Sequence, residues 1–140
     1  MRIFLDANVL FSAAQTDGAV RKLITRLHES DHQLVADAHV WEEARRNLLA
    51  RYPSALATLD ALTRTIRIFP LRNTDQSAGG LPIDDKDKPV LATAISLRCD
   101  SLITGDRTHF GHLFGTAVRG VTIYSPRLAA RSLLQAHGQQ

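Results

Sequence analysis

Near its N-terminus the chain reads Arg2-Ile3-Phe4-Leu5-Asp6-Ala7-Asn8-Val9-Leu10-Phe11-Ser12-Ala13-Ala14. The residues before Asp6 are mostly apolar and favour a short β-strand, whereas the apolar residues after Asp6 have helical spacing. This stretch therefore predicts a buried strand that leads directly into a helix, which is the repeating unit of α/β proteins.

The rest of the chain continues this alternation of short strands and longer helices. Further strands are predicted at 33–36, 66–69, 101–103 and 121–124, and helices at 17–29, 38–51, 53–62, 84–97 and from 125 onward. Residues 71–83 are the one loop-rich stretch of any length, and they end just before an acidic group. Because such connections place helices on both faces of a parallel sheet, we expect a three-layer α/β/α sandwich. One domain over residues 1–140, with a central, mainly parallel sheet, accounts for the whole pattern.

Composition narrows the class of protein. A chain of 140 residues with 44% apolar and 22% charged positions suits one globular domain. No apolar run approaches the roughly 20 residues of a membrane-spanning helix, and Asp6 comes too early for a secretory signal, so we expect a cytoplasmic protein without membrane contact. The single cysteine, Cys99, excludes an internal disulfide and is interpreted as a small apolar filler. The net charge of +3 indicates a polyanionic partner only weakly.

Two aspartates follow predicted strands at the point where each strand ends. Asp6 comes directly after the first strand, and Asp106 follows 101–103 across Thr104 and Gly105. In an open parallel sheet ligands bind beyond the carboxyl ends of the strands, so both aspartates are candidates for a functional site. The alternative is that each of them only caps a helix.

The predicted helix 38–51 supplies a third acid. Glu43 shares a face with Val40, Ala44 and Leu48, whereas Glu42 lies about 100° away around the helix axis. A carboxylate on a face that points to the core needs a cation or an ion pair with an arginine. Glu43 is therefore the candidate, and Glu42 is kept in reserve.

A fourth acid is expected at the start of the predicted helix 84–97, where Asp84, Asp85 and Asp87 stand close together. The helix dipole by itself accounts for one or two of these charges. Asp87 is preferred because Leu91 and Ala94 follow it at helical spacing on the expected buried face, and Asp84 is the reserve candidate.

Four carboxylates at one end of a sheet would repel one another and attract a cation. Each pair about 4 Å apart repels by roughly 4 kcal/mol at an effective dielectric constant of about 20, so the cluster must hold a proton or a cation. Oxygen-only ligands select Mg²⁺ or Mn²⁺. Such an ion lowers the pKa of a water molecule and offsets charge on a phosphodiester undergoing hydrolysis.

Four stretches carry a family resemblance. They are Leu5-Asp6-Ala7-Asn8-Val9-Leu10, Glu43-Ala44-Arg45-Arg46-Asn47-Leu48, Asp87-Lys88-Pro89-Val90-Leu91-Ala92-Thr93-Ala94 and Leu102-Ile103-Thr104-Gly105-Asp106. In this order they resemble the four acidic motifs of PIN-domain nucleases, especially the VapC-like ribonucleases, which are toxins of bacterial toxin–antitoxin pairs. The resemblance spans nearly the whole chain.

The resemblance implies a role for each matching residue. Asp6, Asp87 and Asp106 would bind Mg²⁺ or Mn²⁺, Glu43 would position a second metal ion or the attacking water, and Asn8 and Thr104 would support the site by hydrogen bonds. It also implies an RNA substrate, a homodimer and a cognate antitoxin protein that covers the site. The alternative is a catalytically degenerate PIN-like module that binds RNA or protein.

Three further side chains are candidates for RNA contact. His109 follows Asp106 closely, and Trp41 and Phe110 are large enough to stack on bases. For His109 a surface or packing role is the favoured interpretation, and for Trp41 and Phe110 it is full or partial burial in the core.

Overall fold

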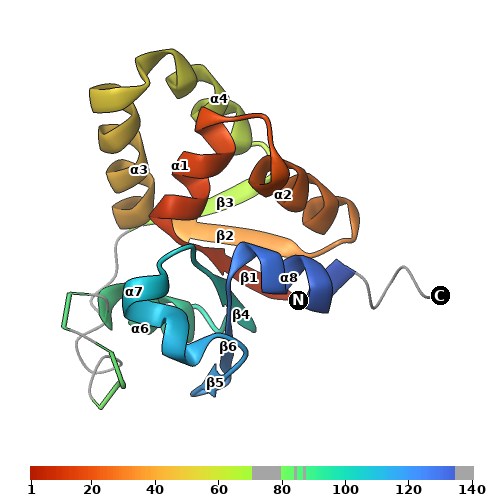
Figure 1. The fold of residues 1–140 in the computed structure, drawn as a ribbon, viewed down its shortest axis with the longest axis vertical. Coiled ribbons are helices and arrows are strands. Elements are labelled where there is room, and N and C mark those ends of the chain that lie inside the picture. The colour runs from red at the N-terminus through yellow and green to blue at the C-terminus, as the bar shows by residue number, and fades with distance from the viewer. Residues whose placement is uncertain (71–79, 84, 87, 135–140) are drawn as a thin grey trace.

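The computed structural model describes residues 1–70, 80–83, 85–86 and 88–134. Within these residues the chain forms a mixed α/β fold with one six-stranded sheet in the order β3-β2-β1-β4-β6-β5 (Figure 1). Neighbouring strands are parallel except for the antiparallel pair β5 and β6. The strands are β1 (Arg2–Leu5), β2 (Gln33–Asp37), β3 (Ile66–Phe69), β4 (Ser101–Ile103), β5 (Ala117–Val118) and β6 (Val121–Tyr124).

Helices cover both faces of this sheet, as predicted for a three-layer sandwich. Figure 1 shows α1 to α4 on one side and α6 and α7 on the other. The helices are α1 (Ala7–Gln15), α2 (Ala19–Glu29), α3 (Ala38–Arg51), α4 (Leu56–Leu62), α6 (Lys88–Ser96), α7 (Arg107–Phe110) and α8 (Pro126–Ala129). Short helical turns at Pro53–Ala55, Gly111–Leu113 and Ala130–Leu134 extend α4, α7 and α8. None of the helices in the described part of the chain is long and apolar enough to cross a membrane.

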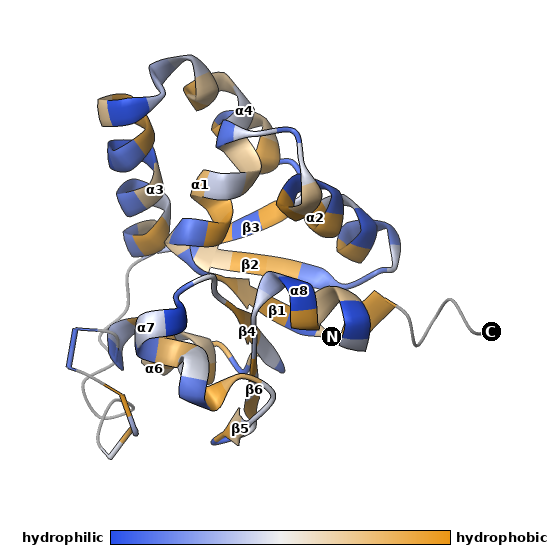
Figure 2. Ribbon diagram, viewed as in Figure 1, coloured by the Kyte–Doolittle hydropathy of each residue, from blue (hydrophilic) through white to orange (hydrophobic). Residues whose placement is uncertain are grey.

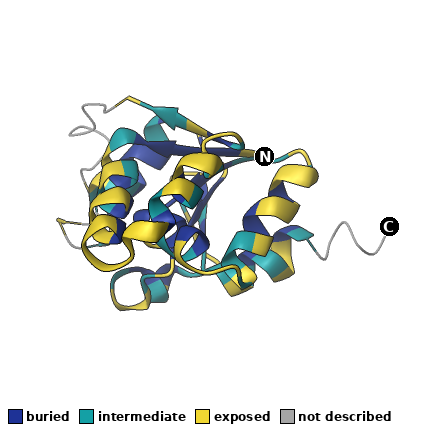
Figure 3. Ribbon diagram, turned by 90° about the horizontal axis from the view of Figure 1, so that it is seen from above, coloured by how far each residue is buried: buried dark blue, intermediate teal, exposed yellow. Residues whose placement is uncertain are grey.

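Strand β1 lies in the middle of the core. Its residues Ile3, Phe4 and Leu5 are fully buried, as a strand covered on both faces requires, and Phe4 stands between Val35 of β2 and Leu102 of β4. Figure 2 shows the apolar colour concentrated along these strands, and Figure 3 shows the buried colour along the inner strands and the exposed colour mainly on the helices. Because β1, β2 and β4 are parallel neighbours, their carboxyl ends meet at one edge.

The start of α6 differs from the prediction, which placed it at Asp84. Helix α6 begins at Lys88, and Asp85 and Lys86 lie in a turn. Pro89 explains the difference, because in a longer helix its ring would clash with the carbonyl group of Asp85, whereas proline suits a first helical turn. Asp84 itself lies outside the described residues.

The prediction also made one strand too short and missed two short elements. Strand β2 extends to Asp37 instead of ending at residue 36. The one-turn helix α7 and the two-residue strand β5 were not predicted, and β5 turns back through Arg119 and Gly120, which have φ of 49° and 86°. The final helix agrees with the prediction, since Ser125 Oγ accepts a hydrogen bond from Leu128 N at 3.1 Å.

Candidate active site

Asp6 lies where β1 passes into α1, and its side chain is almost completely buried. Its Oδ1 accepts a hydrogen bond from Ala7 N at 2.7 Å, which caps α1. Its Oδ2 accepts one from Thr104 Oγ1 at 2.8 Å and a longer one from Asn8 Nδ2 at 3.4 Å. Asp6 therefore does cap a helix, as the alternative interpretation expects, but its second oxygen belongs to a network beyond the helix.

Thr104 and Asn8 connect the end of β1 with the end of β4. Thr104 is fully buried, and its Oγ1 accepts hydrogen bonds from Asp106 N at 3.2 Å and from Asn8 Nδ2 at 3.3 Å. Asn8 Oδ1 in turn accepts a hydrogen bond from Gly105 N at 2.7 Å. A Cβ atom at Gly105 would lie 3.3 Å from Asn8 Oδ1, a tight contact, so glycine suits this close approach. The network joins two loops that are almost 100 residues apart in the sequence.

His109 contacts both carboxylate oxygens of Asp106. Asp106 Oδ1 accepts a hydrogen bond from His109 N at 3.0 Å, which caps α7, and Asp106 Oδ2 lies 2.7 Å from His109 Nδ1. Burial by itself would raise the pKa of the Asp106 carboxyl, but the hydrogen bonds and charge of His109, together with a backbone hydrogen bond from Thr108, outweigh it, so this pKa lies below its ordinary value. Asp106 is therefore ionised near neutral pH.

His109 also faces a hollow beside the site. It lines a cavity of about 450 Å³ together with Thr108, His112 and the segment 81–83. His112 Nε2 lies 3.0 Å from the carbonyl oxygen of Pro82, which holds this segment against α7 and the turn after it. The predicted loop 71–83 thus lies beside the site in its described part, while residues 71–79 are outside the described residues.

The pKa of Asp6 shows that other charges act on it. Burial raises this pKa from the ordinary value of 3.8 to about 6, although hydrogen bonds from Thr104 and Ala7 lower it in part. The negative charges of Glu43 and Asp106 raise it further. Three of the four acids selected from the sequence therefore lie close enough to interact electrostatically.

Glu43 reaches this region from α3. Val40, Ala44 and Leu48 form the buried face of the helix, Glu43 is half-buried at the border of that face, and Glu42 is exposed. Among the described residues no lysine or arginine forms a salt bridge with Glu43. The alternative interpretation, an ion pair between Glu43 and an arginine, therefore finds no support in this part of the chain. Helical spacing thus distinguished the two glutamates correctly by their orientation.

Asp37 is a buried acid at the same edge of the sheet that the sequence interpretation did not select. It ends β2, is 3% exposed, and its Oδ1 accepts a hydrogen bond from Val40 N at 2.9 Å. The signal was available, because Asp37 follows an apolar strand just as Asp6 does. Its contact identifies it as the cap that starts α3, the helix that carries Glu43.

The donor set of the site is suited to a hard metal ion. Asp6, Glu43 and Asp106 offer only carboxylate oxygens, the ligands that Mg²⁺ and Mn²⁺ prefer. Within the described part of the chain, no three acidic, histidine or cysteine side chains are grouped closely enough to hold a metal ion. Asp87, the fourth candidate, and Asp84 lie outside the described residues.

The aromatic and sulfur side chains belong to the core. Phe110 is 1% exposed, and Trp41 is partly buried against the core, so packing is the correct interpretation for both. Cys99 is buried, and burial raises the pKa of its thiol to about 12, in agreement with its interpretation as an apolar filler.

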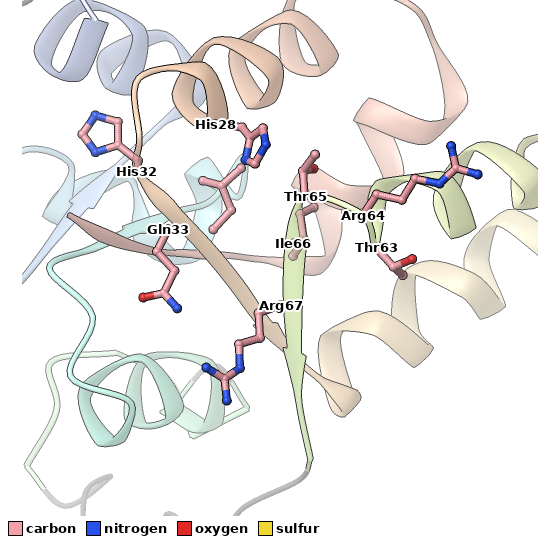
Figure 4. A pocket seen from close by; sticks show the side chains of 9 residues that line it. His28, His32, Gln33, Thr63, Arg64, Thr65, Ile66 and Arg67 are labelled. Carbon is pink, nitrogen blue, oxygen red and sulfur yellow. The ribbon is translucent and has the colours of Figure 1, made fainter.

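A separate cavity of about 300 Å³ lies at the amino ends of β2 and β3, where His28, Arg64 and Arg67 are among the lining residues. Parallel strands place this cavity at the edge of the sheet opposite Asp6. Figure 4 shows that the side chains of Arg64 and Arg67 point in different directions and not toward a common centre. This cavity therefore does not compete with the acidic site as a catalytic centre.

Solved structures with the same fold include three from bacterial VapC and VapBC proteins. VapBC2 from Rickettsia felis, bound to a DNA fragment from their promoter, has a TM-score of 0.67 and 15% identity, with 89% of this chain and 98% of that chain covered. VapBC-1 from nontypeable Haemophilus influenzae has a TM-score of 0.62 and 18% identity, covering 91% and 99% of the two chains. VapC20 from Mycobacterium tuberculosis, a Sarcin-Ricin loop cleaving toxin, has a TM-score of 0.57 and 18% identity, covering 76% and 91%.

Comparison with curated proteins gives no significant sequence match. A family model described as PIN domain, however, matches residues 2–108, which include Asp6, Glu43 and Asp106 and make up well over half of the chain. Together with the order of the sheet and the acids at the carboxyl ends of its strands, this match shows that the chain belongs to the PIN-domain family.

Proposed function

We propose that this chain is a divalent-metal-dependent ribonuclease that hydrolyses RNA phosphodiester bonds, acting as a single domain over residues 1–140. The observation that carries the proposal is the buried carboxyl group of Asp6. Its pKa is about 6, raised by burial and by the charges of Glu43 and Asp106. Burial and like charges both penalise the ionised form of this acid, beyond what its capping of α1 requires. A bound cation relieves both penalties.

In this proposal the carboxylates of Asp6, Asp87 and Asp106 hold Mg²⁺ or Mn²⁺. When bound, the ion lowers the pKa of water and offsets negative charge on the phosphoryl oxygens. Thr104 keeps the Asp6 carboxylate in one orientation through its 2.8 Å hydrogen bond, and Asn8 holds the loop of Gly105 against it. Glu43, half-buried and without a salt bridge to a described lysine or arginine, orients the attacking water and accepts its proton.

The proposed biological role is that of the toxin in a bacterial toxin–antitoxin pair. Membership of the PIN-domain family and the shared fold with VapBC complexes support this role. The partners would then be a cytoplasmic RNA, a cognate antitoxin that covers the acidic site, and a second copy of this chain in a homodimer. Growth arrest on expression of the chain in a bacterium, relieved by co-expression of the antitoxin, is the expected behaviour.

The experiment that tests the activity uses purified protein, freed of any bound inhibitor, and mixed cellular RNA. We expect cutting with Mg²⁺ or Mn²⁺, no cutting with chelator, and a loss of about 100-fold or more for Asp6→Asn. Asp60→Asn is the matched control, because Asp60 is exposed on α4 and the same charge is removed there. It should cut like the wild type.

Two outcomes would overturn the proposal. Equal cutting in chelator, or by Asp6→Asn, would exclude a metal-dependent acidic site. Absence of cutting by the inhibitor-free wild type on mixed RNA, with no metal-dependent stabilisation of the protein, would favour the degenerate RNA- or protein-binding module.

A further inference from the structure

A groove leads away from the acidic site toward α2. One cavity of about 540 Å³ begins at Gly105 and Arg107, next to Asp106, and extends to Phe114, Pro126 and Arg127. A second cavity of about 600 Å³ is lined by the same Pro126 and Arg127 and continues to Val20, Leu23 and Arg131. The two cavities adjoin at the start of α8, where they share Pro126 and Arg127, and we name them together the α8 groove.

The described charged side chains that line the α8 groove are all arginines, so its charge is positive. Arg107, Arg127 and Arg131 line it, and no acidic side chain of the described residues does. None of the three arginines forms a salt bridge with an acid in the described part of the chain. Arg127 and Arg131 are also exposed and four residues apart on consecutive helical turns, so their guanidinium groups are available to a ligand.

The lining between the arginines is largely apolar. Phe114, which packs partly against the core, and Pro126 are each partly exposed in the part of the groove next to the site. Unpaired bases stack on such side chains, whereas arginines bind the phosphates that connect them. A double helix keeps its bases stacked inside, so its bases cannot enter cavities of this size.

From these observations we infer that the α8 groove binds the single-stranded stretch of RNA on one side of the bond to be cut, with Arg127 and Arg131 on its phosphates. This inference rests on the proposed ribonuclease function and names the form of its substrate. The groove starts beside Asp106, so a strand that enters it is led to the acidic site.

The test measures binding separately from cutting. Labelled oligouridylate is bound to the full chain in chelator, across a series of salt concentrations, for the wild type, Arg127→Gln and Arg131→Gln. Each variant should lower the slope of log K against log salt by about 0.7, which corresponds to about fivefold weaker binding at about 0.1 M salt. Both residues are exposed, so the variants should unfold at the wild-type temperature.

The matched control is Arg64→Gln, which removes the same charge from the cavity at the opposite edge of the sheet. It should bind oligouridylate as the wild type does, and RNA duplex should compete poorly. With Mn²⁺ present, the groove variants should raise KM for single-stranded RNA and leave kcat unchanged.

Two results would overturn the α8 groove as the RNA track. In the first, both groove variants bind oligouridylate as tightly as Arg64→Gln. In the second, the variants bind oligouridylate as the wild type does and weaken only the binding of an acidic peptide. If wild type cuts RNA in either case, the groove inference alone fails. If the arginines govern binding but no RNA is cut, the proposed ribonuclease function fails and the groove remains.

Discussion

Asp6 is the residue whose proposed role in the site costs the fold most stability, because the site needs its carboxylate ionised in buried surroundings. Its side chain is 6% exposed, accepts three hydrogen bonds, and feels the negative charges of Glu43 and Asp106. The hydrogen bonds favour the ionised carboxylate, but burial and like charges outweigh them, since the pKa of Asp6 rises to about 6. Without a bound cation, Asp6 therefore destabilises the fold at neutral pH.

This conflict predicts how stability depends on pH. The folded pKa of Asp6 lies above its ordinary value of 3.8, so the folded state binds the proton more tightly than the unfolded state does. The contribution of Asp6 to the free energy of unfolding is fully present below about pH 4 and is lost as the pH rises through about 6. The whole loss amounts to about 3 kcal/mol, because one pKa unit corresponds to about 1.4 kcal/mol.

Asp6→Asn should remove most of this penalty. In chelator at about pH 7 the variant should therefore unfold at a higher urea concentration than the wild type, and the difference should shrink toward about pH 4. Asp60→Asn controls for the removal of an exposed charge. A variant less stable than the wild type at both pH values would show that the hydrogen bonds to Thr104 and Asn8 matter more than the charge.

At the scale of elements, the sequence predicts most of what positions the site. Asp6 and Asp106 were found because carboxyl ends of parallel strands meet at one edge, and Glu43 was separated from Glu42 by helical spacing. Both rules rely on regular elements several residues long. The contact of Asp106 with His109 escaped them because α7 is a single turn, too short to show a period.

Other parts of the site could not be read from local patterns. The hydrogen bond from Thr104 to Asp6 spans 98 positions in the chain, and its formation depends on β1 and β4 being neighbours in the sheet. The start of α6 was placed too early because three acids suggested a first turn, whereas Pro89 sets the boundary at Lys88. Asp37 was passed over because a cap and a site residue look alike in sequence.

Asp37 provides the prediction that belongs to this scale. Asp37→Ala should lower the free energy of unfolding by about 2 kcal/mol, because Val40 N loses its partner in buried surroundings. Asp37→Asn, which can still accept this hydrogen bond, is the matched control and should lose much less. Urea unfolding measures both. Similar loss in the two variants would show that the charge of Asp37, and not its capping of α3, is what the fold requires.

At the scale of the whole molecule, the acids of the site come from separate βα units. Asp6 follows β1, Glu43 lies on α3 after β2, and Asp106 follows β4. These units are far apart in the sequence, and the contacts that join the loops of Asp6 and Asp106 form only when β1 and β4 are neighbours, so the site exists only when the central sheet is complete. A cation that binds these acids must therefore bind the folded state in preference to the unfolded chain.

This dependence predicts that metal binding stabilises the entire domain. At a free Mn²⁺ concentration about 100 times its Kd, the free energy of unfolding should rise by about 2.7 kcal/mol, a shift of several degrees in Tm. Asp6→Asn should show little of this shift, and Asp60→Asn should show all of it. Calorimetry with Mn²⁺ and with chelator makes the measurement. Because the shift requires no RNA, it reports on the acidic site even if the preferred substrate is absent, and an unchanged Tm in the wild type would mean that these carboxylates do not act together.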